Sequence, residues 1–229
     1  MIAGMSYPGG KGKCYQRLIN LMPPHQTYIE SHLGSGAVLK NKRPAQINIG
    51  IDADERVIAT WRQSAPAWCS LVHGDAAMFL AQYPFTGKEL VYADPPYVIE
   101  TRRRARIYRC EYTDADHVRL LDVLTVLPCM VMLSGYENPM YGERLTGWRK
   151  VTFSANTQVG VREECVWTNF PEPTVLHDAA FLGATFRERQ TVRRRHQRLV
   201  DRFERMDPAE REHVLQLLNT HYGARANTP

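Results

Sequence analysis

The stretch VYADPPYV, Val91 to Val98, decides how this chain is interpreted, because it places a carboxylate, two prolines and a tyrosine directly after an apolar run. The run Leu90–Ala93 predicts a buried strand. In open α/β sheets ligands bind beyond the carboxyl ends of the strands, so we expect Asp94–Tyr97 at a ligand site. Each proline fixes its φ and lacks an N–H, which makes the turn rigid while its carbonyls remain acceptors.

Outside this stretch, short β-rich runs alternate with helical patterns up to about residue 170, which predicts an α/β fold with a Rossmann-like, mostly parallel sheet and flanking helices. The expected strands are 27–31, 47–52, 90–93, 130–134, 150–153 and 165–170. The expected helices are 11–21, 37–42, 55–64 and 115–127.

A domain boundary is expected where Pro171 and Pro173 interrupt the chain, since proline continues neither a central strand nor a helix interior. We therefore expect a catalytic domain at 1–173 and a basic helical extension at 174–229. Within the extension, Asp207, Pro208 and Glu210 predict the start of a last helix that runs to about His221.

The extension also carries a short heptad-like seam, which must be buried against the catalytic domain or against a second subunit of a homodimer. Its members step by four, three, four and three: Val192, His196, Leu199, Phe203 and Met206.

The formal net charge of +5 is modest, but the arginines are unevenly distributed. One cluster follows the DPPY turn and the other lies in the extension: Arg102, Arg103, Arg104, Arg106 and Arg109; Arg187, Arg189, Arg193, Arg194, Arg195 and Arg198. Clustered arginine indicates a phosphate-rich partner such as nucleic acid. A solvated surface is the alternative for each cluster taken alone.

Other classes of protein are disfavoured. No apolar run approaches the roughly 18 residues that span a bilayer, and the N-terminus lacks the apolar segment of a secretory signal, so we expect a cytoplasmic protein. The five cysteines are scattered without a CxxC pair or a Cys/His cluster, which predicts neither a zinc site nor a disulfide framework.

The chemistry of the DPPY turn suits a planar heterocycle that carries an exocyclic amino group. Such an amine is a poor nucleophile because its lone pair is delocalised into the ring, and two acceptors on its hydrogens hold it nearer to tetrahedral geometry. Asp94 and a turn carbonyl are such acceptors. Tyr97 can stack on the base, a contact of roughly 1–3 kcal/mol in single-stranded nucleic-acid recognition.

Four further segments bear on the ligand, which they indicate to be of the nucleotide type. In TYIESHLGSGAVL, 27–39, Gly34 and Gly36 allow close approach of the ligand to a strand end. Asp52 ends the next strand and can accept from ribose hydroxyls, and Asp75 stands where a third strand would end, within reach of an adenine amino group. SYPGGKGK, 6–13, follows no strand and has no Ser or Thr after its lysine, so it is not a triphosphate loop, although its lysine can neutralise a small carboxylate.

In their order along the chain, SYPGGKGK, ESHLGSGAVL, IGIDAD, HGDAA, ADPPYV, VMLSGY and EECVWTNF resemble the motifs of the Dam-type DNA adenine-N6 methyltransferases, over about residues 5–170. The resemblance implies a class I methyltransferase fold, S-adenosylmethionine as cofactor, no metal, and double-stranded DNA in which the target adenine is flipped out.

The resemblance also implies roles for individual residues. Lys11 matches the lysine that holds the methionine carboxylate, Asp52 the ribose acid and Asp75 the acid near the cofactor adenine. The other residues that match cofactor motifs are Tyr7, Pro8, Gly9, Gly10, Glu30, Gly34, Ser35 and Gly36, and the catalytic motif matches Asp94, Pro95, Pro96 and Tyr97, with Asp94 also beside the cofactor.

The chain departs from that family in two places. Ser31-His32 replaces the usual Pro-Phe, so His32 is expected to line the cofactor site or to fill the strand end, without a catalytic task. Relatives insert a target-recognition region between the Asp75 and Asp94 motifs, whereas 76–93 leaves only 18 residues here. DNA contacts must come from elsewhere, and the candidates are Arg102, Arg103, Arg104, Arg106, Arg193, Arg194 and Arg195.

Later positions carry weaker expectations. Asp114 is expected to cap a helix and His117 to be partly exposed on it, while Ser134 and Tyr136 are candidates for lining the base pocket. The segment 164–169 is expected to supply the core of a late hairpin and no chemistry. RNA adenine methylation, cytosine-N4 methylation and a catalytically silent nucleic-acid binder stay open as alternatives.

Overall fold

The computed structural model describes residues 11–12, 14–102, 108–157 and 160–223. The chain divides into two compact units, Met1–Ala179 and Ala180–Pro229, and each is described by itself.

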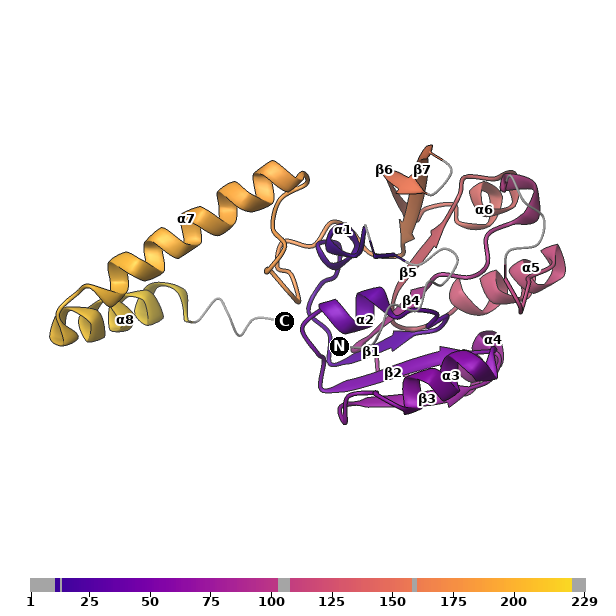
Figure 1. Ribbon diagram of the computed structural model, residues 1–229, viewed down its shortest axis with the longest axis horizontal. Helices are drawn as coiled ribbons and strands as arrows, with labels where there is room; N and C mark the ends of the chain where they lie inside the picture. The colour runs from indigo at the N-terminus through magenta and orange to yellow at the C-terminus, as the bar shows by residue number, and fades with distance from the viewer. Residues whose placement is uncertain (1–10, 13, 103–107, 158–159, 224–229) are drawn as a thin grey trace. The chain divides into compact units, whose positions relative to one another are not determined.

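The first unit is built on a seven-stranded sheet in the order β3-β2-β1-β4-β5-β7-β6 (Figure 1). Its strands are β1 (Thr27–Glu30), β2 (Ile47–Asp52), β3 (Cys69–His73), β4 (Glu89–Ala93), β5 (Met130–Gly135), β6 (Arg149–Thr157) and β7 (Gly160–Thr168). The first five strands pair in parallel, whereas β7 pairs antiparallel with both β5 and β6. The predicted Rossmann-like sheet with flanking helices is therefore confirmed.

The strand order reverses at the centre of the sheet. Thr27 of β1 pairs with Ile47 of β2 on one side and with Glu89 of β4 on the other, so the chain builds outward in both directions from β1. A crevice forms at such a switch point, beyond the carboxyl ends of the two central strands. The DPPY turn follows β4 and the glycine-rich loop follows β1, so both lie at this crevice.

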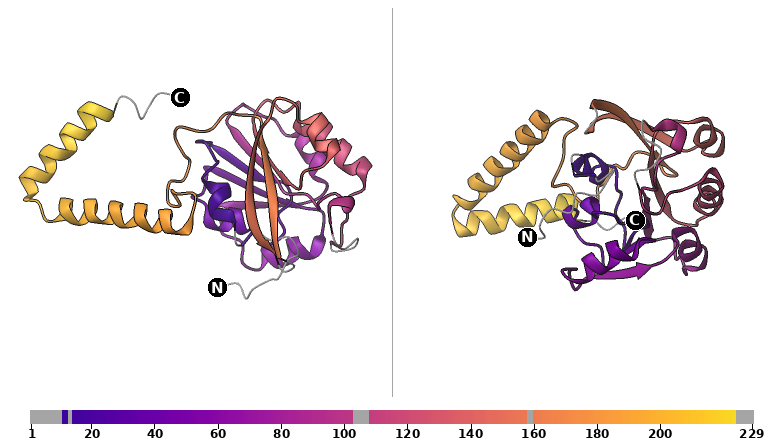
Figure 2. Two further views of the ribbon diagram at one scale, coloured as in Figure 1. Left: turned by 90° about the horizontal axis from the view of Figure 1, so that it is seen from above. Right: turned by 45° about the vertical axis from the view of Figure 1, so that its right-hand side comes forward.

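Helices cover both faces of the sheet (Figure 2). Side chains alternate between faces along a strand, so Ile29, Val91 and Val131 pack with α4 (Ala76–Gln82), α5 (Asp114–Leu124) and α6 (Pro139–Arg144) in the main apolar core. The opposite face is covered by α1 (Tyr15–Ile19), α2 (Ala37–Asn41) and α3 (Glu55–Arg62), whose buried residues include Leu18, Leu39 and Trp61. A 3₁₀ turn, η1 (Ile99–Thr101), follows the DPPY segment.

The start of α5 corrects two expectations. Thr113, and not Asp114, is the N-cap, because its side chain accepts from the Asp116 backbone while the Asp116 carboxylate accepts from the Thr113 backbone. His117 is fully buried instead of partly exposed, and its Nδ1 lies 3.0 Å from the Tyr141 hydroxyl. The tyrosine supplies the hydrogen-bond partner that a buried imidazole nitrogen requires.

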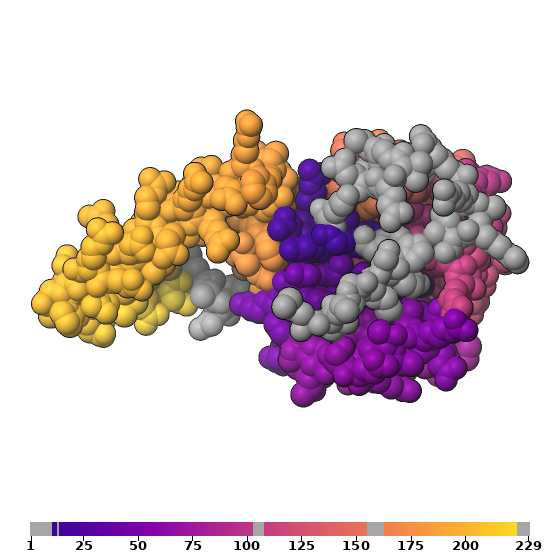
Figure 3. Space-filling model, viewed as in Figure 1, coloured from indigo at the N-terminus to yellow at the C-terminus, as the bar shows by residue number. Residues whose placement is uncertain are grey.

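The second unit contains α7 (Phe186–Glu204) and α8 (Pro208–Tyr222), drawn in orange and yellow in Figure 3. The predicted start of the last helix is confirmed, since Asp207 is the N-cap and accepts from the Ala209 backbone. Neither helix has a buried residue within this unit, and Leu199 of the predicted seam is 61% exposed. No helix in the described part of the chain is long and apolar enough to cross a membrane.

Candidate active site

A cleft lies at the switch point and encloses about 600 Å³, including the part open to solvent. Small-molecule sites usually measure about 300–1,000 Å³. The predicted site residues that line it come from four separate segments: Lys11, Glu30, His32, Gly34, Ser35, Gly36, Asp52, Asp94 and Pro96. Six lining residues were not predicted from the sequence: Leu33, Ala37, Ala53, Tyr108, Cys110 and Tyr112.

The glycine-rich loop has the backbone conformation that its sequence predicts. Gly34 (φ 44°) and Gly36 (φ 58°) both lie in the left-handed region that side chains disfavour. Space is restricted as well, because a Cβ on Gly36 would lie 2.1 Å from the Trp61 ring. Trp61 also donates from Nε1 to the Gly34 carbonyl at 3.0 Å, so this indole on α3 supports the loop from behind.

Two buried carboxylates hold the same loop in place. Asp52 accepts from the Gly34 backbone at 2.8 Å with one oxygen and from the Asp54 backbone at 2.8 Å with the other. Glu30 accepts from the Tyr28 hydroxyl and from the Leu39 backbone, both at 2.9 Å, and so supplies the cap that Gly36 cannot give to α2. Burial raises the Glu30 pKa to about 8 and also raises the Asp52 pKa above its ordinary value.

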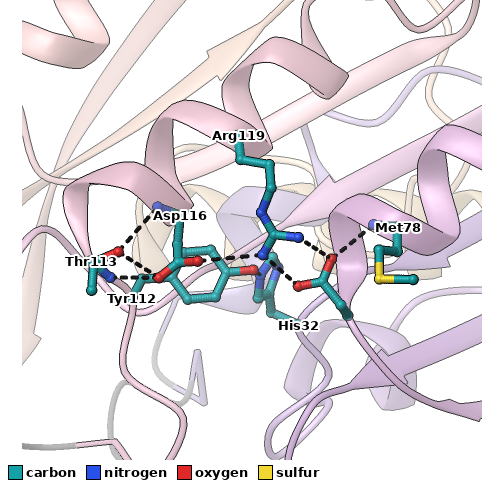
Figure 4. A network of polar contacts seen from close by, with 7 residues as sticks. His32, Met78, Tyr112, Thr113, Asp116 and Arg119 are labelled. Carbon is teal, nitrogen blue, oxygen red and sulfur yellow. Dashed lines mark hydrogen bonds and ion pairs between the residues drawn. The ribbon is translucent and has the colours of Figure 1, made fainter.

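His32 forms one wall of the cleft together with Tyr112. Its Nε2 lies 2.9 Å from the Tyr112 hydroxyl and its Nδ1 lies 3.0 Å from the Ser31 hydroxyl, as Figure 4 shows for the tyrosine. Burial lowers the His32 pKa to about 3, so the imidazole is neutral near pH 7. The wall is thus an aromatic pair in which the histidine is held on both sides.

Asp75 is not among the residues that line the cleft. Its carboxylate caps α4 by accepting from the Met78 backbone at 2.8 Å, and it accepts two hydrogen bonds from Arg119, of 2.8 and 3.1 Å. Arg119 also contacts Asp116, so the network joins the start of α4 to α5 (Figure 4). In this arrangement the acid predicted to lie near the cofactor adenine connects two helices.

At the DPPY turn, the Asp94 carboxylate is paired with Lys11, whose Nζ lies 2.6 Å from Oδ1. The same ammonium lies 4.9 Å from the centre of the Tyr97 ring. Burial alone would lower the Lys11 pKa, but the charges of Asp94 and Glu164 outweigh it, so the pKa is well above its ordinary value. Pro95 is buried and Pro96 faces the cleft.

Glu164 does not line the cleft, but it is a further charged residue beside the DPPY turn that the sequence interpretation missed. It was expected to supply hairpin core, yet its carboxylate is buried beside the turn, acts on the Lys11 and Asp94 charges, and lies 4.0 Å from the Cys14 thiol. The strand register explains why Glu164 lies beside the turn, because its neighbour Cys165 on β7 pairs with Gly135 at the end of β5. The antiparallel strand thus returns an acid to the edge where the parallel strands end.

The other candidates for the base pocket pack around the turn. Ser134 is fully buried, with its hydroxyl 2.9 Å from the Tyr92 hydroxyl. Tyr136 meets the Tyr97 ring edge-on at 4.5 Å between ring centres. Neither residue lines the cleft, and nor does Tyr97, which is 6% exposed. Tyr136 therefore packs against the ring of the DPPY tyrosine inside the protein.

Of the arginines predicted to contact DNA, Arg102 makes its contacts within the protein. Its guanidinium donates to the Tyr97 carbonyl and pairs with Glu111 at 2.7 Å, and its side chain is 3% exposed. Arg193, Arg194 and Arg195 are exposed on α7. The predicted residues Tyr7, Pro8, Gly9, Gly10, Arg103, Arg104 and Arg106 lie outside the described residues.

Within the described ranges, no group of three or more His, Cys, Asp or Glu side chains is arranged to hold a metal ion.

Comparisons with known proteins identify no family. No protein-family model matches the chain, and no curated protein matches its sequence. Among solved structures, precorrin 8W decarboxylase of Methanobacterium thermoautotrophicum is similar, with 12% identity, a TM-score of 0.47, and coverage of 75% of this chain and 97% of its own. Magnesium protoporphyrin IX methyltransferase of Synechocystis, with bound SAM, has 12% identity and a TM-score of 0.44. The match covers 68% of this chain and 80% of that one. The M. capricolum TrmK in complex with S-adenosylhomocysteine has 5% identity and a TM-score of 0.46. The match covers 90% of this chain and 93% of that one.

Proposed function

We propose that the protein transfers the methyl group of S-adenosylmethionine to the N6 amino group of adenine in DNA. The observation that carries the proposal is the DPPY turn at the carboxyl end of central strand β4, with Asp94 and Pro96 on the cleft. An acceptor and an aromatic ring held on a rigid turn suit a planar base that carries an amino group.

The lining of the cleft fits the proposed cofactor. Its acids, Glu30 and Asp52, offer oxygen acceptors to the amino and hydroxyl groups of a nucleoside amino acid, and Lys11 is the cation for the carboxylate of that ligand. The left-handed glycines leave the strand end open to a ligand. Bound there, S-adenosylmethionine supplies a methyl group already activated on a positively charged sulfur.

The residues of the turn would position the base. Asp94 accepts one hydrogen of the amino group and a turn carbonyl accepts the other, which directs the nitrogen lone pair at the methyl group. Tyr97 stacks on the base. Holding the reactants in line supplies much of the rate enhancement in such a transfer. The base must leave the duplex first, at a cost of a few kcal/mol.

Duplex DNA is the proposed partner, and α7 offers a surface for its phosphates. Successive residues on a helix differ in direction by about 100°, so Arg193, Arg194 and Arg195 point three ways and cannot form one patch. Arg194 instead shares an arc of about 80° with three other positions: Arg187, Arg198 and Arg202. We call these four the arginine stripe. No described acid forms a salt bridge with any of them.

A homodimer is the second proposed association of the extension. The second unit leaves large apolar side chains uncovered: Leu199 at 61%, Leu215 at 47%, Leu218 at 50% and Tyr222 at 60% exposed. Sedimentation at increasing concentration tests this directly. A dimer that Leu199→Asp dissociates supports the proposal, and a wild-type monomer at all concentrations contradicts it.

The function is tested by incubating the protein with S-adenosylmethionine labelled in its methyl group and with duplex DNA or RNA. We expect label in DNA. Label found only in RNA would indicate an RNA methyltransferase instead. A protein that binds nucleic acid but neither binds the cofactor nor transfers label would be a silent binder.

A further inference from the structure

One ammonium group occupies both recognition elements of the proposed base site. Lys11 Nζ lies 2.6 Å from the Asp94 carboxylate and 4.9 Å from the centre of the Tyr97 ring. The Lys11 and Asp94 side chains are only 5% and 16% exposed. Asp94 therefore already accepts from an N–H donor, and that donor lies over the ring.

This arrangement resembles the one proposed for the substrate. An ammonium and the amino group of adenine are both N–H donors, and both are attracted to a carboxylate beside an aromatic ring. They compete for the same oxygen and the same ring. A base can reach Asp94 in the proposed way only after the ammonium has moved.

The ammonium needs another anion in order to move, because a buried charge without a partner is strongly unfavourable. Among the described residues that line the cleft, Lys11 is the one lysine or arginine, and it stands with the acids Glu30, Asp52 and Asp94. A negatively charged group of a ligand in this cleft would therefore be attracted to Lys11. Glu164 is a further buried acid whose charge acts on Lys11.

We propose that Lys11 is a positioning residue shared by two sites: without a ligand its ammonium keeps Asp94 and Tyr97 closed to the base, and the cofactor carboxylate draws it away. This inference rests on the proposed function. It adds that the cofactor must bind before the base, and that the carboxylate, not the nucleoside, opens the base site.

Two cofactor-like ligands separate these effects. S-adenosylhomocysteine carries the amino-acid carboxylate, whereas methylthioadenosine keeps the adenosine and the sulfur but lacks it. Fluorescent single strands of oligo(dA) and oligo(dT) report base entry, since they share phosphates and differ in the base. With S-adenosylhomocysteine bound, we expect wild type to prefer oligo(dA) by about tenfold, within the usual range for coupled sites. With methylthioadenosine, or with no ligand, the preference should disappear.

Lys11→Met provides the matched variant, and Lys88→Met removes the same charge at an exposed position outside the cleft lining. In Lys11→Met the preference for oligo(dA) should persist under all three ligand conditions, and S-adenosylhomocysteine should lose its affinity advantage over methylthioadenosine. Lys88→Met should behave as wild type does.

The inference is overturned if wild type prefers oligo(dA) equally with methylthioadenosine, or if Lys11→Met still requires S-adenosylhomocysteine. It is also overturned if S-adenosylhomocysteine binds and no condition yields a preference for oligo(dA). A failure of the proposed function would look different, since either S-adenosylhomocysteine would not bind to wild type, or duplex DNA would take up no label on adenine in the transfer assay.

Discussion

The Asp52 carboxylate accepts a 2.8 Å hydrogen bond from the Gly34 backbone, which joins the end of β2 to the loop that follows β1. The second oxygen of Asp52 accepts from Asp54, so the acid is held from both sides. With Trp61 behind the loop, the floor of the cleft is fixed by contacts within the chain itself. Such preorganisation lowers the cost of ordering when a ligand binds.

Gly36→Ala should disrupt this floor. Its Cβ would lie 2.1 Å from the Trp61 ring, at a backbone conformation that alanine disfavours. We expect a loss of roughly 1–3 kcal/mol in the free energy of unfolding, as for other overpacked sites, and weaker cofactor binding. Denaturant unfolding and calorimetric titration measure the two effects.

The control for that variant is Gly142→Ala. Gly142 lies in α6, and an added Cβ meets nothing within 4 Å. Alanine is favoured over glycine in a helix by roughly 0.5–1 kcal/mol, so this variant should be as stable as wild type or more stable. Equal behaviour of the two variants would refute the role given to Gly36.

Acid should destabilise the protein through its buried histidines. Burial lowers the pKa of His32 to about 3, while the unfolded chain titrates near the ordinary 6.5. Between these values the unfolded state binds a proton that the native state does not, so this contribution to stability is complete above pH 6.5 and is lost as the pH falls.

Urea unfolding as a function of pH measures this effect. His32→Asn should reduce the pH dependence of the unfolding free energy by about one proton between pH 6 and pH 4. His221→Asn, at an exposed position on α8, serves as the control substitution. If the unfolding free energy of His32→Asn depended on pH as strongly as that of wild type, the His32 imidazole would not be held neutral in the folded protein.

The arginine stripe predicts a directional effect on DNA affinity. Arg198→Glu removes a phosphate contact, so the slope of log affinity against log salt should fall by about one. Arg193→Glu changes the same charge on roughly the opposite side of α7 and should leave the slope near the wild-type value. If the slope of log affinity against log salt were equal in the two variants, the arginine stripe would not be the surface that binds DNA.

The sequence predicted the parts of the fold that have strong local patterns. The buried strands next to the site were recognised from their apolar runs, and the turn chemistry at their ends placed Asp52 and Asp94 at one edge of the sheet. A strand was expected to end before Asp75, but β3 was given no bounds because it is only half buried and its pattern is mixed. The helix α6 was missed although Asn138 and Pro139 give it a recognisable cap and first turn.

Contacts between distant segments could not be predicted from the sequence. Nothing local to Glu164 indicates that β7 returns antiparallel beside β5 and brings it to Lys11. The same holds for Tyr112, which reaches His32 across 80 positions, and for the bond between His117 and Tyr141. Local patterns predict elements, whereas the partners of buried polar groups depend on how those elements pack.

The most direct test of the central claim is mass spectrometry of nucleosides from duplex DNA incubated with the protein and S-adenosylmethionine, for wild type, Asp94→Asn and the control Lys88→Met. We predict N6-methyldeoxyadenosine with wild type and with Lys88→Met, and a rate at least about 100-fold lower with Asp94→Asn, as for loss of a positioned acid–base group. Methylated cytosine, no methylated nucleoside, or an undiminished rate in Asp94→Asn would contradict the account.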